Sequence, residues 1–134
     1  YLGKLSGPLL DRVDLRVFMH REKAGAFETE AGESTAVVRD RVNSARDAAA
    51  QRWKKYGIGT NAEVSGVLLR RRFRLESDAM APLKTALDRG VLSIRGVDRT
   101  LRVAWTLSDL AGRTSPGREE VTTALSFRDA GGGQ

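Results

Sequence analysis

Arg12 stands where a short predicted helix meets a predicted strand, and its guanidinium could bind phosphate. Ser6 suits the cap of that helix, and Pro8 suits its first turn because the missing N–H is not needed there. Hydrolysis of a phosphate anhydride is helped by an arginine from a neighbouring subunit. The guanidinium is permanently charged and offers a fork of N–H donors to the phosphate oxygens. The alternative is a surface arginine paired with Asp11 or Asp14.

A second group of cations lies in the run from Arg70 to Arg74, in which Phe73 interrupts the arginines. Arginines beside an aromatic ring can hold phosphates and stack a base. Arg70, Arg71, Arg72 and Arg74 are therefore candidate DNA contacts. The pattern favours a more ordinary interpretation, a solvated helix face with Phe73 in the core.

Other reactive side chains are few. The chain has one histidine, His20, and no cysteine, which excludes disulfides, thiolate nucleophiles and cysteine-based zinc sites. His20 is predicted to be an ordinary surface or strand-end residue. No metal site is predicted, since Asp11 and Asp14 lie near arginines and are expected to form local salt bridges.

The composition is that of one basic globular domain. The 134 residues carry 23 Lys plus Arg against 17 Asp plus Glu, a net charge of +6 that allows contact with phosphates. No apolar run approaches the ~20 residues of a membrane helix, and nothing at the start resembles a signal peptide. We therefore expect a cytoplasmic protein without membrane contact. The first residue is not Met, and we expect a fragment of a longer protein.

The predicted fold is mainly α, a helical bundle preceded by an isolated strand and a flexible linker. Val13, Leu15 and Val17 alternate with charged residues, which is the period of a strand with one apolar face. A single strand cannot satisfy its own edges, so residues 12–20 are expected to join a sheet formed with strands outside this sequence. Glycines and mixed charges predict a linker over residues 21–33.

Serine caps and glycine stops predict five helices within residues 34–128. They are expected over residues 34–56, 65–73, 76–89 and 94–111, and from Pro116 onward. An apolar stripe at helical spacing marks the inner face of the first of these helices: Val38, Val42, Ala45, Ala49 and Trp53. The glycine-rich end, residues 129–134, is expected to be disordered.

Several stretches, in order, resemble magnesium-chelatase-like AAA+ ATPases of the ComM/YifB type. They are Pro8 to Arg12, Val38 to Val42, Asn61 to Gly66, Leu92 to Arg95, Arg99 to Ala104, and Asp109 to Gly112. The resemblance spans roughly residues 1–128. Trp105 departs from it, because the family often has arginine there.

The resemblance implies that residues 1–20 end an ATPase core and that residues 34–128 form its helical lid. It implies that Arg12 is an arginine finger acting in trans on the next subunit of a self-associated ring, with ATP and Mg²⁺ bound. It also implies that Arg95 is the sensor 2 arginine at the nucleotide's terminal phosphates. A helix N-terminus carrying an arginine suits phosphate independently. The alternative for Arg95 is an ion pair with Asp98.

The implied activity of the ring is on DNA. Two alternatives stay open: a magnesium chelatase subunit that inserts metal into a porphyrin, and a non-catalytic interaction module. The sequence contains no Gly-x-x-x-x-Gly-Lys-Ser/Thr loop and no acidic Walker B strand. This fragment is therefore expected to be monomeric, to bind ATP weakly if at all, and not to hydrolyse it.

Overall fold

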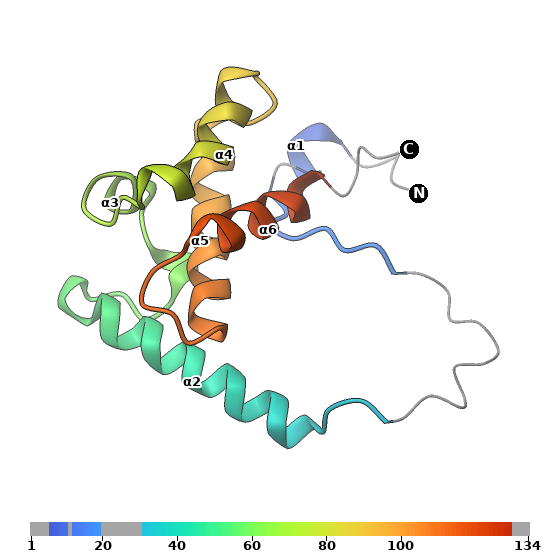
Figure 1. The fold of residues 1–134 in the computed structure, drawn as a ribbon, viewed down its shortest axis with the longest axis vertical. Helices are drawn as coiled ribbons and strands as arrows, with labels where there is room; N and C mark the ends of the chain where they lie inside the picture. The colour runs from blue at the N-terminus through green and yellow to red at the C-terminus, as the bar shows by residue number, and fades with distance from the viewer. Residues whose placement is uncertain (1–5, 11, 20–30, 130–134) are drawn as a thin grey trace.

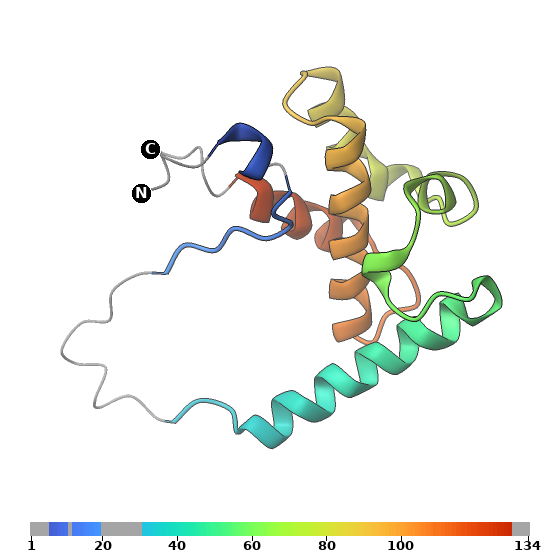
Figure 2. The ribbon, with the colours of Figure 1, turned by 180° about the vertical axis from the view of Figure 1, so that it is seen from behind.

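A computed structural model describes residues 6–10, 12–19 and 31–129. The central element is the helix α5 (Ile94–Leu110), against which the other long helices pack (Figure 1; from behind in Figure 2). These are α2 (Thr35–Trp53), α3 (Gly66–Arg71), α4 (Ser77–Asp88) and α6 (Arg118–Asp129). Three short elements complete the fold: α1 (Gly7–Leu10) and the 3₁₀ turns η3 (Lys54–Tyr56) and η4 (Asn61–Glu63). The predicted helical bundle is confirmed.

The helix ends follow the sequence signals closely. The hydroxyls of Ser34, Ser65 and Ser93 each accept a hydrogen bond, at 3.1–3.3 Å, from the backbone N–H three residues on. Such caps satisfy N–H groups that have no partner inside a helix. At the other end of α4 and α5, Gly90 and Gly112 have φ of 70° and 67°, a conformation that glycine adopts without steric cost.

The last helix begins later than predicted, at Arg118 instead of Pro116. Gly117 occupies the cap position, because its carbonyl accepts from the N–H of Val121 at 3.2 Å and its own N–H donates to the Glu120 carboxylate at 2.8 Å. The carboxylate thus satisfies the N–H at the cap, as in one half of a capping box. Pro82 lies in the interior of α4, where it removes one backbone donor.

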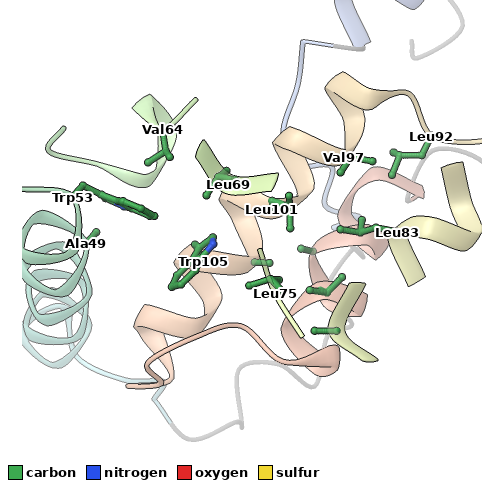
Figure 3. Close-up of a cluster of buried hydrophobic side chains, with 14 residues drawn as sticks. Ala49, Trp53, Val64, Leu69, Leu75, Leu83, Leu92, Val97, Leu101 and Trp105 are labelled. Carbon is green, nitrogen blue, oxygen red and sulfur yellow. The ribbon is translucent and has the colours of Figure 1, made fainter. Parts of the chain in front are cut away.

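The core lies along α5, with side chains contributed by α2, α3, α4 and α6 (Figure 3). The ring of Trp53 packs edge-on against Phe73 and Trp105, with centroids 4.6 and 5.7 Å apart. Phe73 therefore packs against the core, as the sequence pattern favours. Val38 was predicted to face inward but is 41 % exposed, because the first half of α2 extends beyond the bundle (Figure 1).

The predicted strand within residues 12–20 is not supported. Residues 13–19 run as an irregular chain beside α6, and the Arg16 N–H donates to the Phe127 carbonyl at 2.9 Å. Leu15 and Val17 are 50 % and 63 % exposed. The physical reason is that a ladder needs a second strand, and none lies in the described part of the chain.

Several predicted features fall wholly or largely outside the described residues: His20, most of the linker over 21–33, and the tail over 130–134. Residues 31–34 form no regular element and lead directly into α2. Asp129, the first residue of the predicted tail, is the last residue of α6. The linker and tail therefore stay predictions.

Candidate functional site: an arginine-lined cavity

One face of α5 carries four charged side chains, Arg95, Asp98, Arg99 and Arg102. Residues three, four and seven apart share one face of an α-helix. Another face of the same helix carries buried residues such as Val97 and Leu101, which pack in the core. The core contacts therefore fix the rotation of α5 and with it the direction of the arginine face.

The arginine face forms a cavity of about 370 Å³ with the start of the chain. Its lining consists of Pro8, Arg12, Arg95, Asp98, Arg99 and Arg102. Arg12 and Arg95 come from opposite ends of the sequence pattern that implied a nucleotide site, and the fold brings both to one cavity. Four arginines against one aspartate give this cavity a strongly positive potential.

The start of the chain is held on α5 by a contact that we call the Arg99 bridge. The Nη1 of Arg99 donates to the Arg12 backbone carbonyl at 2.6 Å and to the Asp14 carboxylate at 2.8 Å. Both acceptors lie just C-terminal to the Arg12 side chain. The bridge thus fixes the backbone from which the Arg12 guanidinium projects.

The Asn61 to Gly66 stretch and α3 contact two residues of the cavity lining. The Nε of Arg102 donates to the Val64 carbonyl at 2.8 Å, and Asp98 forms an ion pair with Arg70 of α3. Gly66 lies directly under Asp98, where a Cβ would overlap the carboxylate. Two of the four cavity arginines, Arg99 and Arg102, are therefore fixed by contacts within the protein.

The other two cavity arginines, Arg12 and Arg95, are exposed. Neither guanidinium forms an ion pair or hydrogen bond within residues 6–10, 12–19 and 31–129. The alternative partners are occupied, because Asp14 pairs with Arg99 and Asp98 pairs with Arg70. Asp11 lies outside the described residues. Two guanidiniums thus remain available to an external anion.

A buried polar network secures the far end of α5 against α2 and η4. Asp109 accepts from Arg52 Nη1 at 3.0 Å and from Asn61 Nδ2 at 2.9 Å, and the Asn61 side-chain oxygen accepts from Trp53 Nε1 at 2.8 Å. The Arg52 guanidinium also lies over the Trp105 ring, 4.4 Å from its centroid. Asn61 of the family-like stretch is therefore a structural residue.

The run from Arg70 to Arg74 divides between two roles. Arg70 points to Asp98, whereas three arginines of the run are exposed, as are two lysines of η3. These five cations, which we call the basic surface, are Lys54, Lys55, Arg71, Arg72 and Arg74. Two of them lie at the Tyr56 ring, with Lys55 Nζ 5.2 Å and Arg72 Cζ 6.0 Å from its centroid. No ion pair engages them within the described residues.

Sequence reasoning missed Arg99, Arg102, Lys54 and Lys55. Spacing could have revealed the first two, because Arg95, Arg99 and Arg102 repeat at i, i+4 and i+7 on a helix whose cap was recognised. The lysines carried no comparable signal. Their proximity to the arginine run arises from the ring contact between Tyr56 and Phe73, whose centroids are 5.8 Å apart.

The fold and cavity define a helical domain with an arginine-lined cavity at its surface. Residues 32–128 match the family described as magnesium chelatase, subunit ChlI C-terminal. The chain belongs to this magnesium-chelatase-like family and corresponds to its C-terminal region.

Similar proteins support the assignment. The chain is 74 % identical over 131 residues to an uncharacterized protein of Mycobacterium tuberculosis, a match that covers 98 % of this chain and 26 % of that protein. It is 35 % identical to uncharacterized protein YifB of Escherichia coli and 32 % identical to competence protein ComM of Haemophilus influenzae. Each of these two matches covers 96 % of this chain and 25 % of the relative. The chain thus spans about a quarter of these relatives, and no solved structure matches it.

Membrane-spanning helices and clusters of metal-ligating side chains are both absent from the described residues. None of the helices there combines the length and apolar character that crossing a membrane requires. No group of three or more acidic, histidine or cysteine side chains is arranged there to hold a metal. Cytoplasmic location stays a prediction.

Proposed function

We propose that this chain is the lid region of an ATP-hydrolysing ring, and that its cavity receives the terminal phosphates of ATP. The observation that carries the proposal is the convergence of Arg12 and Arg95 on one cavity, both without partners in the described part of the chain. Guanidinium forks match phosphate oxygens in pairs, and such charge-assisted bonds are the stronger kind. A positive, partly enclosed site suits a triphosphate.

Each arginine has a distinct role in this proposal. Arg12 acts in trans and stabilises the charge that develops as the γ-phosphoryl group leaves the ATP of the adjoining subunit. Arg95, in the first turn of α5, responds to the same phosphates and couples the position of the helical domain to the nucleotide state. Because one cavity holds both side chains, both engage a single triphosphate.

The cavity does not fit Mg²⁺ itself. Divalent magnesium takes oxygen ligands, usually one or two carboxylates with water and phosphate. The carboxylate that lines this cavity, Asp98, is already paired with Arg70, and the other charged groups are cationic. Any magnesium that accompanies ATP is therefore held by groups other than this lining.

The test uses the full-length protein with its ATPase core. Arg12→Ala should lower kcat by about 10³–10⁵ while nucleotide affinity changes little, because an arginine finger acts mainly in the transition state. Arg95→Ala should weaken ATP binding as well as turnover. Arg118→Ala, an exposed arginine outside the cavity that pairs with Asp78, is the matched control. Normal turnover in Arg12→Ala would overturn the finger assignment.

The basic surface supports DNA as the partner of the ring. Five exposed cations, two of them at one aromatic ring, can follow a phosphate backbone, and counterion release would make binding strongly dependent on salt. Lys55→Gln combined with Arg72→Gln should weaken DNA binding and reduce its salt dependence without changing ATPase activity in the absence of DNA. DNA binding equal to that of the unsubstituted protein would remove the basic surface from the proposal.

Metal insertion into a porphyrin is the alternative that the family description favours. ATPase activity stimulated by DNA would support the DNA-acting ring, and stimulation by a porphyrin and Mg²⁺ would support the chelatase. A non-catalytic interaction module is the third possibility. Light scattering of this chain addresses it, because a stable oligomer would favour the module and a monomer fits a lid separated from its ring.

A further inference from the structure

We propose that Arg99 is the positioning residue for Arg12. The Arg99 bridge joins the Arg12 carbonyl and the Asp14 side chain, both directly C-terminal to the Arg12 side chain, to the same helix that carries Arg95. One guanidinium therefore sets the separation of the two unpartnered arginines. This inference rests on the proposed function, since it concerns how the same phosphates are met.

The Arg99 bridge is the contact that suits this role. The Arg99 side chain is 25 % exposed, whereas its partner Asp14 is 56 % exposed, so the arginine is partly anchored in the wall of the cavity. Within the described residues 12–19, a second contact to the bundle lies further along, where the Arg16 N–H meets Phe127. Loss of the Arg99 bridge would free the backbone around Arg12 while leaving the later contact intact.

The consequence for the reaction is geometric. Arg12 is useful only if its guanidinium reaches the developing charge while Arg95 contacts the same phosphates. A displacement of about 1 Å in such a group can lower the rate by about 10²-fold. Because the bridge ties both cations to α5, any movement of that helix carries Arg12 and Arg95 together. The helical domain would thus deliver two phosphate contacts as one unit.

The first experiment needs no ATP hydrolysis. Backbone ¹⁵N relaxation of this 134-residue chain should show residues 12–15 becoming more mobile in Arg99→Gln. Arg102→Gln removes the same charge from the same cavity but leaves the bridge intact, and it should leave the mobility of residues 12–15 unchanged. Equal mobility of that segment in Arg99→Gln and the unsubstituted chain would overturn the bridge as a positioning contact.

The second experiment measures turnover in the full-length protein. Arg99→Gln should lower kcat by about 10²-fold with KM within about twofold, and Arg99→Lys should recover part of the loss because it keeps a donor for the Arg12 carbonyl. The double variant Arg12→Ala with Arg99→Gln should be no slower than Arg12→Ala alone, since Arg99 acts through Arg12. If instead the kcat losses of the two single variants multiply in the double variant, Arg99 acts independently of Arg12, and the proposal is overturned.

The two possible failures can be told apart. Unchanged turnover in Arg99→Gln, with a slow Arg12→Ala, would overturn the role of Arg99 and leave the finger assignment standing. Unchanged turnover in Arg12→Ala would overturn the proposed function and, with it, the catalytic consequence of the bridge. The relaxation experiment would then still show whether Arg99 holds the segment.

Discussion

Among the described glycines, Gly66 is the one at which an added Cβ would come closest to a neighbouring side chain. It begins α3 directly beneath Asp98, and a Cβ there would overlap the carboxylate that pairs with Arg70. Gly66→Ala must therefore push Asp98 out of its ion pair or shift the first turn of α3. We expect a loss of about 1–3 kcal/mol in the free energy of unfolding, the usual cost of overpacking, measured by urea denaturation.

Two comparisons isolate the cause of that loss. Gly59→Ala is the matched control, because its Cβ would lie at an ordinary 3.7 Å from Glu63 and its φ is not in the left-handed region. In an Asp98→Ala background, Gly66→Ala should cost much less, since the overlapping carboxylate is gone. The same cost in both backgrounds would contradict the explanation.

At the scale of elements, the arginine face depends on how α5 is fixed at its far end. The Asp109 side chain is 1 % exposed and accepts hydrogen bonds from Arg52 and Asn61. Asp109→Asn removes the charge that compensates a partly buried guanidinium. We expect a loss of about 3–5 kcal/mol in the free energy of unfolding at neutral pH, as when one partner of a buried pair is removed. Asp47→Asn, on the exposed part of α2, should change stability little.

The elements show what the sequence could and could not predict. Local chemistry defined most helix boundaries, because a cap such as Ser93 and a stop such as Gly112 act within a few residues. The alternation at Val13 to Val17 predicted a strand wrongly, since strand formation depends on a distant partner that local pattern does not contain. For the cavity, the sequence predicted two of the lining residues but not that they come together. Arg12 and Arg95 came from motif resemblance, whereas their meeting depends on tertiary contacts made by Arg99.

The 3₁₀ turn η4 supplies a prediction about pH. The Glu63 carboxylate accepts from the Thr60 hydroxyl at 2.9 Å and from its N–H at 3.0 Å, and these bonds hold the pKa of Glu63 below its ordinary value of 4.5. A lowered folded-state pKa means that the charged carboxylate stabilises the fold above the unfolded-state pKa, and that this contribution disappears as pH falls through the folded-state pKa. The Tm advantage over Glu63→Ala should therefore shrink as the pH is lowered from about 7 through that range.

A second variant tests the named cause. Thr60→Val removes the hydroxyl donor, so the pKa of Glu63 should move back toward its ordinary value in an NMR titration of the side-chain carboxyl. A titration identical to that of the unsubstituted chain would show that the hydroxyl bond does not lower the pKa.

At the scale of the whole molecule, stability and the proposed function belong to different parts of the chain. Within the described residues, the buried hydrophobic core consists of residues from Ala45 to Ala124. The start of the chain, described over residues 6–10 and 12–19, adds mostly exposed side chains and a few hydrogen bonds at the surface. Its contribution to the cavity is the Arg12 side chain and Pro8.

This division predicts that a chain of residues 31–129 folds without the preceding segment. We expect its free energy of unfolding to lie within about 1 kcal/mol of that of the whole chain, because exposed ion pairs such as Asp14–Arg99 contribute little. Binding of inorganic tripolyphosphate, measured by calorimetry at low salt, should instead weaken, since Arg12 is removed from the cavity. Restoring residues 1–30 with Arg12→Ala should not recover that binding. If the shortened chain fails to fold, or binds tripolyphosphate as tightly as the whole chain, stability and anion binding are not separable in this way.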